Sequence, residues 1–194
     1  MSAADRETWD ARWSARGVEL SEPEAFLTDE AARLAGGGRA LDLAGGSGRH
    51  ALWLAARGYD VTLLDVSPRA LEAAGSAASA RGLGLSLLEL DTDAIDAGAA
   101  AFPPGPWDVI LCHHFLWRPL FAHAGATLSE AGLLLFAQPT RVNLERHPRP
   151  SARFLLEPGE LAELAAPLRV LSLSEGWRAS GRHEAQLVAA RHGG

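Results

Sequence analysis

A glycine-rich segment between an apolar run and a helical run holds the residues best suited to bind a ligand. Residues 40–43 are apolar apart from Asp42, and the turn residues follow at once, namely Ala44, Gly45, Gly46 and Gly48. Glycine accepts positive φ and, without a Cβ, lets the backbone approach a ligand closely. A helix that begins at Arg49 would point its unpaired N–H groups back at this turn. The segment therefore predicts a ligand-binding turn between a strand and a helix.

Two carboxylates decide which ligand this turn would favour. Asp65 closes the next apolar run, where an acid accepts hydrogen bonds from the two hydroxyls of a ribose, which indicates a nucleoside cofactor. Gly46, Gly48 and Ala51 also satisfy the dinucleotide pattern G-x-G-x-x-A, which favours NAD. Asp42 would repel a pyrophosphate but could receive an ammonium group, which favours S-adenosylmethionine instead. The alternative for Asp42 is a capping carboxylate that holds the turn.

A second group of reactive side chains ends the run 107–112. His113 and His114 follow Cys112 at the carboxyl edge of an expected strand, where ligands bind in open α/β sheets. One of them could serve as a general base, since histidine titrates near neutrality. Neighbours on an extended strand point to opposite faces, so we expect at most one histidine to face the site and the two to make a poor metal pair. The alternative is a polar strand end with satisfied hydrogen bonds.

Arginines concentrate after these histidines. Arg118 could bind an anionic substrate or the cofactor carboxylate, or form a surface salt bridge. The loop 139–153 has only Glu145 to oppose its four arginines, Arg141, Arg146, Arg149 and Arg153. This loop follows an expected strand, which favours a substrate lid with a basic rim and an anionic acceptor. The other interpretation is a solvated loop.

Strands and helices alternate along the chain. We expect strands at 40–43, 60–65, 85–90, 107–112 and 133–137, and helices at 21–34, 49–57, 68–82, after Pro119 and at 160–166. This alternation predicts a parallel sheet. The last two strands, 168–174 and 184–190, are joined by a short loop, which suits an antiparallel hairpin. The expected fold is a doubly wound, mostly parallel, seven-stranded Rossmann-like sheet in three α/β/α layers, within one domain that spans 1–194.

Composition excludes several functions. The chain has 194 residues with 47% hydrophobic content and a net charge of −6, which argues against a nucleic-acid partner. Because it contains no lysine, Schiff-base chemistry and Walker-type phosphate loops are excluded. A single cysteine, Cys112, excludes an intrachain disulfide and a cysteine-rich zinc site. No apolar run reaches the length of a membrane span, so we expect a cytoplasmic protein. We further expect a monomer or a homodimer, and no metal site.

Several segments match a known family. Residues 41–55 resemble motif I of the class I S-adenosylmethionine-dependent methyltransferases, and more narrowly the small bacterial enzymes related to the tellurite-resistance and thiopurine methyltransferases. Residues 9–13, 65–67, 118–121 and 155–161 are similar to their other blocks, so the resemblance covers nearly the whole chain. Ala44 stands where the superfamily usually has its first glycine, and Gly45 where cysteine is frequent. Alanine is expected to be tolerated there if its φ is negative.

The resemblance implies methyl transfer from S-adenosylmethionine to a small molecule by in-line displacement. It implies that residues 44–48 cradle the methionine end, Asp65 binds the ribose, and Val66 packs on the adenine. It further implies that the adenine edge meets Asp91, Thr92 and Asp93, and that residues 1–35 form a helical cap with Trp9 and Trp13. Two alternatives remain, an NAD(P)-dependent oxidoreductase and an S-adenosylmethionine-binding protein without catalysis.

Overall fold

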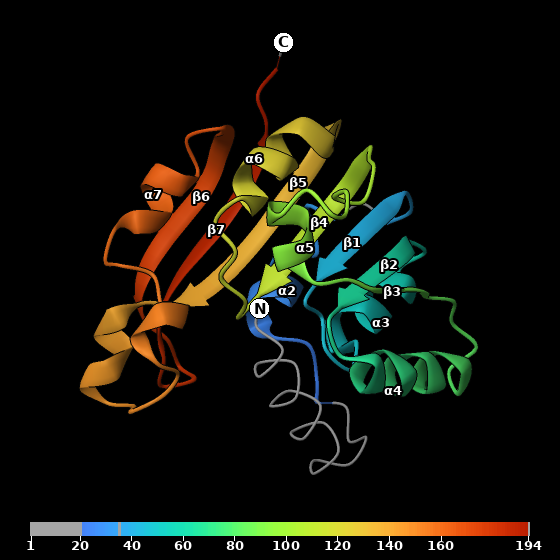
Figure 1. Ribbon diagram of the computed structural model, residues 1–194, viewed down its shortest axis with the longest axis horizontal. Coiled ribbons are helices and arrows are strands. Elements are labelled where there is room, and N and C mark those ends of the chain that lie inside the picture. Colours follow the sequence, from blue (N-terminus) through green and yellow to red (C-terminus); the bar gives the residue numbers. More distant parts are fainter. Residues whose placement is uncertain (1–20, 35, 194) are drawn as a thin grey trace. The chain divides into compact units, whose positions relative to one another are not determined.

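The computed structural model describes residues 21–34 and 36–193 and divides into two compact units, Met1–Pro104 and Gly105–Gly194. Each unit is treated separately below, and the elements are labelled in Figure 1. Trp9 and Trp13, with the helix expected around them, lie outside the described residues. Within the described ranges, no helix combines the length and the apolar character that crossing a membrane would take.

The first unit is built on three parallel strands. They are β1 (Arg39–Leu43), β2 (Asp60–Asp65) and β3 (Ser86–Glu89), in the order β3-β2-β1. The connecting helices, α3 (Arg49–Ala55) and α4 (Pro68–Ser79), pack on these strands. The sequence predicted all five elements with small differences at their ends, because parallel strands covered by helices are continuously apolar.

Helix α4 shows how the sequence fixes the end of an element next to the glycine turn. The Ser67 hydroxyl accepts a hydrogen bond from the Ala70 amide at 3.3 Å, and Pro68 occupies the first helical position. The buried face of α4 consists largely of alanines, including Ala74. These short side chains let the backbone at Gly48 pack closely, since a Cβ added to Gly48 would lie 2.9 Å from the Ala74 Cβ.

One local expectation in this unit is wrong. The helix expected at 21–34 is reduced to α2 (Ala25–Asp29), because Glu24 is extended and makes no side-chain cap. The Ser21 hydroxyl contacts Arg49, at 3.3 Å. After β3, a short helix that the sequence did not predict, α5 (Thr92–Asp96), begins where the Asp91 side chain accepts from the Asp93 amide and caps it.

The second unit contains a mixed sheet. Its strands are β4 (Trp107–His113), β5 (Leu128–Pro139), β6 (Leu168–Trp177) and β7 (His183–Arg191), in the order β4-β5-β7-β6. β4 and β5 are parallel, while β7 is antiparallel to both β5 and β6, so the expected C-terminal hairpin is confirmed. β7 is therefore inserted between β5 and β6, and β6 forms the edge of the sheet.

Helices and turns complete the second unit. Helix α6 (Leu120–Thr127) packs on β5, β6 and β7, and α7 (Glu160–Leu164) precedes β6. The segment after β5, expected as a loop, contains two 3₁₀ turns, η1 (Arg141–Glu145) and η2 (Ala152–Phe154).

We predict that Gly48→Ala destabilises the protein more than Gly82→Ala. Both glycines have positive φ, +83° and +65°, so each substitution pays a backbone cost of about 1–2 kcal/mol. Only Gly48 also faces a neighbour, Ala74, whereas nothing lies within 4 Å of a Cβ at Gly82. Overpacking should add roughly 1–3 kcal/mol at position 48. Urea unfolding followed by circular dichroism measures the difference, and equal losses would contradict the packing argument.

Candidate cofactor site and the polar end of strand 4

The turn after β1 alternates between ordinary and left-handed backbone. Ala44, Gly46 and Gly48 have φ of +56°, +58° and +83°. The condition under which alanine was expected to be tolerated, a negative φ, is therefore not met, and this position holds an alanine in a conformation that favours glycine. A Cβ on Gly45 would collide with the Leu63 side chain and lie 2.5 Å from the Asp42 Oδ2. Gly45 is thus required by the packing beneath the turn.

The amides of the turn are already hydrogen-bonded within the unit. The Ala44 and Gly45 amides donate to the Leu64 carbonyl at 2.7 and 3.4 Å, and the Gly48 amide donates to the Gly45 carbonyl at 3.0 Å. The Gly46 amide donates to the Asp65 carboxylate at 2.9 Å. These four groups hold the turn in one shape, so they are not donors for a phosphate in this conformation.

Asp65 links the turn to the start of α4. Its Oδ2 accepts from the Gly46 amide and its Oδ1 accepts from the Ser67 amide, both at 2.9 Å. The carboxylate is nearly buried, and hydrogen bonds to an ionised acceptor are stronger than those between neutral groups. The sequence analysis assigned Asp65 to a ribose. In the structure its carboxylate fixes the glycine turn, and its contact with a ribose stays a prediction.

Asp42 lies beneath the same turn in a different environment. The residue is fully buried, and neither carboxylate oxygen meets a donor with full hydrogen-bond geometry among the described residues, although the Ala51 amide is near enough to act on the carboxylate. Burial raises the pKa of Asp42 to about 7; the Ala51 amide and the Arg49 guanidinium lower it, while the Asp65 charge raises it. A buried carboxylate without a partner is costly in isolation. A positive group nearby would therefore favour the ionised form of Asp42.

The first turn of α3 is tied to the segment that precedes α2. The Arg49 guanidinium contacts the Glu24 carboxylate at 3.0 Å. The Glu24 amide donates to Nε2 of the buried His50 at 3.3 Å. The segment 21–24 is thus fastened to the helix that leaves the glycine turn.

The residues expected at the adenine have mixed environments. Val66 and Thr92 are buried, and Asp93 is exposed in the first turn of α5. Asp91 is half-buried and caps that helix. Asp91 thus has a structural role as a helix cap, and the contact of all four residues with a cofactor stays a prediction.

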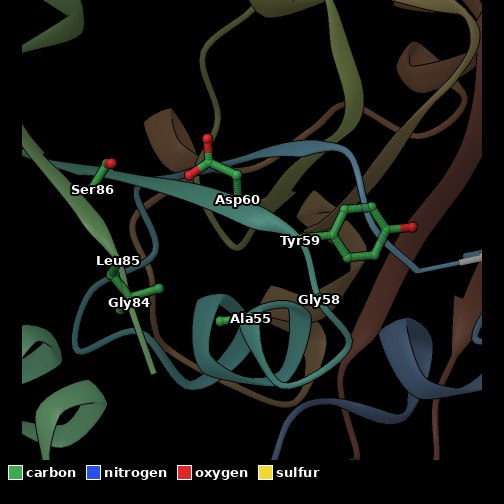
Figure 2. Close-up of a pocket in the computed structure, with 7 residues that line it drawn as sticks. All are labelled: Ala55, Gly58, Tyr59, Asp60, Gly84, Leu85 and Ser86. Carbon is green, nitrogen blue, oxygen red and sulfur yellow. The ribbon is translucent and has the colours of Figure 1, made fainter. Parts of the chain in front are cut away.

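A surface hollow of about 480 Å³ lies at the opposite ends of the strands. Its lining includes Tyr59 and Asp60 at the start of β2 and Ser86 at the start of β3 (Figure 2). Ligands in open α/β sheets bind beyond the carboxyl ends of strands, where the glycine turn lies. This hollow is therefore separate from the candidate cofactor site.

At the end of β4, the two histidines are arranged differently from the expectation. The strand ends at His113, and His114 adopts φ +61°. The two rings consequently lie side by side with centroids 3.8 Å apart, so the expectation that they point to opposite faces is wrong. Nε2 of His114 lies 2.7 Å from Oε1 of Glu184 on β7. Sequence reasoning found the histidines and missed this partner.

The arginines of the second unit are mostly engaged. Arg118 forms a two-point ion pair with Glu160, at 2.6 and 3.2 Å. The Arg141 guanidinium lies 2.6 Å from Glu157, so the expectation that only Glu145 opposes the loop is wrong. These contacts favour the salt-bridge interpretation that the sequence left open.

The loop after β5 is fastened to the tip of the β6–β7 hairpin. The Arg146 guanidinium lies 3.7 Å from the centre of the Trp177 ring, and the His147 ring nitrogen is 2.7 Å from the Gly181 carbonyl. The His183 amide donates to the Asn143 side chain at 3.3 Å. A lid that moves by itself is not supported, because the loop and the hairpin tip would have to move together.

Two structural roles that we did not predict, those of Asp65 and Glu184, have a signal in the sequence. Asp65–Val66–Ser67 has the spacing of a turn in which an aspartate accepts from the amide two residues on. Glu184 and Gln186 place two polar side chains on one face of an otherwise apolar strand, β7. Such a pair on a buried strand indicates a polar contact inside the protein, although it does not identify the partner.

Comparisons with known proteins agree on the class. Residues 40–132 match the family model described as a methyltransferase domain. Similar solved structures include TehB from Haemophilus influenzae, with 19% identity, TM-score 0.71 and coverage of 95% of this chain and 67% of that one. A TehB-like methyltransferase from Corynebacterium glutamicum has 18% identity, TM-score 0.68 and coverage of 98% and 100%. An S-adenosylmethionine-dependent methyltransferase from Clostridium acetobutylicum has 13% identity, TM-score 0.69 and 98% coverage of both chains. A search of curated proteins found no match.

The strand order, 3-2-1-4-5-7-6 with β7 antiparallel, and the similarity to these structures define a class I methyltransferase fold. The methyltransferase domain model covers the strand–turn–helix segment that holds Asp42, Asp65 and the glycines. Residues 40–132 therefore match a methyltransferase domain, and the fold of the chain is that of the class I methyltransferases.

We predict that Asp65→Asn destabilises the protein by roughly 1.5–3 kcal/mol, the scale of a charged hydrogen bond that is lost. An asparagine keeps one acceptor oxygen but turns its NH₂ group toward either the Gly46 or the Ser67 amide, which are both donors. Urea unfolding checks this, with Asp60→Asn on the exposed start of the same strand as the control. A variant as stable as the control would show that Asp65 does not hold the turn.

Proposed function

We propose that the protein transfers a methyl group from S-adenosylmethionine to a small-molecule acceptor by in-line displacement, with the first unit holding the cofactor at residues 44–48. The observation that carries this proposal is the buried carboxylate of Asp42, which meets no donor with full hydrogen-bond geometry among the described residues. S-adenosylmethionine brings a sulfonium and an ammonium group, whereas a dinucleotide brings a pyrophosphate. A carboxylate beneath the turn attracts the first and repels the second.

The hydrogen bonds of the turn support the same choice. Dinucleotide sites bind the pyrophosphate through amides at a glycine turn and a helix N-terminus. Here the Gly46 amide is used by Asp65 and the Gly48 amide by the Gly45 carbonyl. The G-x-G-x-x-A pattern that favoured an NAD(P)-dependent oxidoreductase is therefore present, but the amides of its two glycines are already used within the unit.

Within this proposal, the residues of the first unit contact different parts of the cofactor. Asp42 supplies negative charge beneath the methionine end, and the conformation of residues 44–48 sets the shape of the cradle. Asp65 holds that cradle and accepts hydrogen bonds from the ribose, while Val66 and residues 91–93 adjoin the adenine. The cofactor, when bound, supplies an electrophilic methyl carbon. The protein contributes alignment of the acceptor and exclusion of water, effects that can provide roughly 7–11 kcal/mol of the barrier reduction.

The acceptor is proposed as a small molecule because the net charge of −6 opposes a polyanionic partner. The anionic acceptor expected from the basic loop loses its main support, since Arg118 and Arg141 are neutralised by Glu160 and Glu157.

We predict that Asp42→Asn stabilises the cofactor-free protein at pH 8 and weakens its binding of S-adenosylmethionine. The raised pKa means that the folded chain resists ionisation, so stability falls as the pH rises from about 4 to above 7. Asparagine removes this loss, a gain of at most about 4 kcal/mol at pH 8 and none at pH 4. Thermal unfolding at both pH values and calorimetric titration with S-adenosylmethionine test the two effects.

The matched control is Glu72→Gln, which removes an exposed carboxylate from α4. It should change neither the pH dependence of stability nor cofactor affinity. Titration of the wild type with NADH provides the comparison ligand. Tight binding of NADH, or undiminished binding of S-adenosylmethionine by the Asp42→Asn protein, would contradict the proposed site.

A further inference from the structure

Three arginines of the second unit carry charge that no salt bridge neutralises. Arg146 and Arg149 lie in the loop after β5, Arg182 lies at the tip of the β6–β7 hairpin, and all three are exposed. Among the residues that the structure describes, none of the three forms a salt bridge, whereas Arg118 and Arg141 each pair with a glutamate. These three residues are called the arginine surface below.

A buried asparagine brings the two segments of this surface together. Asn143 is 2% exposed, its side-chain oxygen accepts from the His183 amide at 3.3 Å, and its NH₂ group donates to the Arg149 carbonyl at 3.4 Å. Because Arg182 directly precedes His183, the backbones of Arg149 and Arg182 both adjoin Asn143. The loop and the hairpin tip accordingly lie side by side (Figure 1).

Further contacts hold the arginine surface in one shape. The Arg146 guanidinium lies 3.7 Å from the centre of the Trp177 ring, and a ring nitrogen of His147 lies 2.7 Å from the Gly181 carbonyl. A guanidinium stacked on an indole still presents its planar fork of N–H donors at the edge. A group that is already ordered loses less freedom on binding, which favours association. These contacts distinguish the surface from a loop of freely moving, solvated arginines.

An apolar side chain is exposed within the same loop. Leu144 follows Asn143 directly and is 37% exposed. Arginines and aromatic rings around an apolar contact are typical of protein interfaces. A nucleic acid would use the charges alone, and a membrane would require a much larger apolar face. The combination therefore favours a polypeptide that carries both carboxylates and apolar side chains.

We propose that the arginine surface is a docking site for an acidic segment of a partner protein, in which carboxylates flank an apolar side chain. The carboxylates pair with the guanidiniums, whose planar fork allows a two-point contact, and the apolar side chain covers Leu144. The site lies wholly within the second unit and requires neither the cofactor nor a methyl acceptor. It therefore goes beyond the proposed function and is tested independently of it.

Fluorescence anisotropy of the full chain with a labelled peptide of alternating glutamate and leucine tests this proposal. We expect saturable binding that weakens as the Debye length shortens from about 10 Å at 0.1 M salt to about 3 Å at 1 M. The double variant Arg149→Gln/Arg182→Gln, which leaves the stacked Arg146 in place, should bind about tenfold more weakly. No saturable binding, or equal binding of a peptide with glutamine in place of glutamate, would overturn the proposal.

Matched variants separate the arginine surface from the charge of the whole chain. Arg69→Gln/Arg81→Gln removes two exposed charges from the first unit and should leave the affinity unchanged. Glu145→Gln removes the acidic neighbour of the surface and should strengthen binding by about two- to threefold. Leu144→Ser should weaken binding of the glutamate–leucine peptide but not of polyglutamate. Equal losses in the two double variants, with circular dichroism unchanged, would contradict a local site.

Two further probes represent the other classes of partner. They are single-stranded DNA and vesicles of phosphatidylcholine with phosphatidylglycerol, and tighter binding of either than of the peptide would overturn the assignment to a polypeptide. Calorimetric titration with S-adenosylmethionine should give the same affinity for Arg149→Gln/Arg182→Gln as for the wild type. Failure of the peptide to bind would thus reject the docking site alone, while failure of the wild type to bind S-adenosylmethionine would reject the proposed function alone.

Discussion

The hydrogen bond from the Gly46 amide to Asp65 is the contact on which the glycine turn depends. It joins the turn to the end of β2, and through Ser67 it also fixes the start of α4. Because Asp65 takes this amide, the turn has a defined shape before any ligand arrives. The neighbouring Asp42 receives no such partner among the described residues, so two aspartates in one unit are given different tasks by their surroundings.

This division of tasks explains how a turn with a dinucleotide-like pattern can favour another ligand. Glycine spacing is shared by both kinds of site, since both need positive φ and a close backbone. The two kinds of site differ in where the backbone amides donate and in the charge beneath the backbone. An anion is bound by free amides, whereas a cation is bound by a carboxylate. Beneath the turn at residues 44–48 lies a carboxylate, that of Asp42.

Most of the strands and helices could be predicted from the sequence, because strands covered by helices are apolar throughout and helix caps have local signatures. β2 and the Ser67 cap of α4 follow from residues that are neighbours along the chain. The positive φ of Ala44 could not be predicted, because alanine does not signal a left-handed conformation. Nor could the pairing of His114 with Glu184, 70 residues apart, because it depends on how β4, β5 and β7 are arranged.

The central claim is that Asp42 acts as the negative seat for a positively charged cofactor. Counting the protons released when S-adenosylmethionine binds at pH 6.5, by calorimetry in buffers of different ionisation enthalpy, tests it most directly. With a pKa of about 7, Asp42 is mostly protonated in the cofactor-free protein, and a cation bound beside it expels that proton. The account predicts proton release by the wild type and none by the Asp42→Asn variant. Binding without proton release by the wild type, or equal release by both proteins, would contradict it.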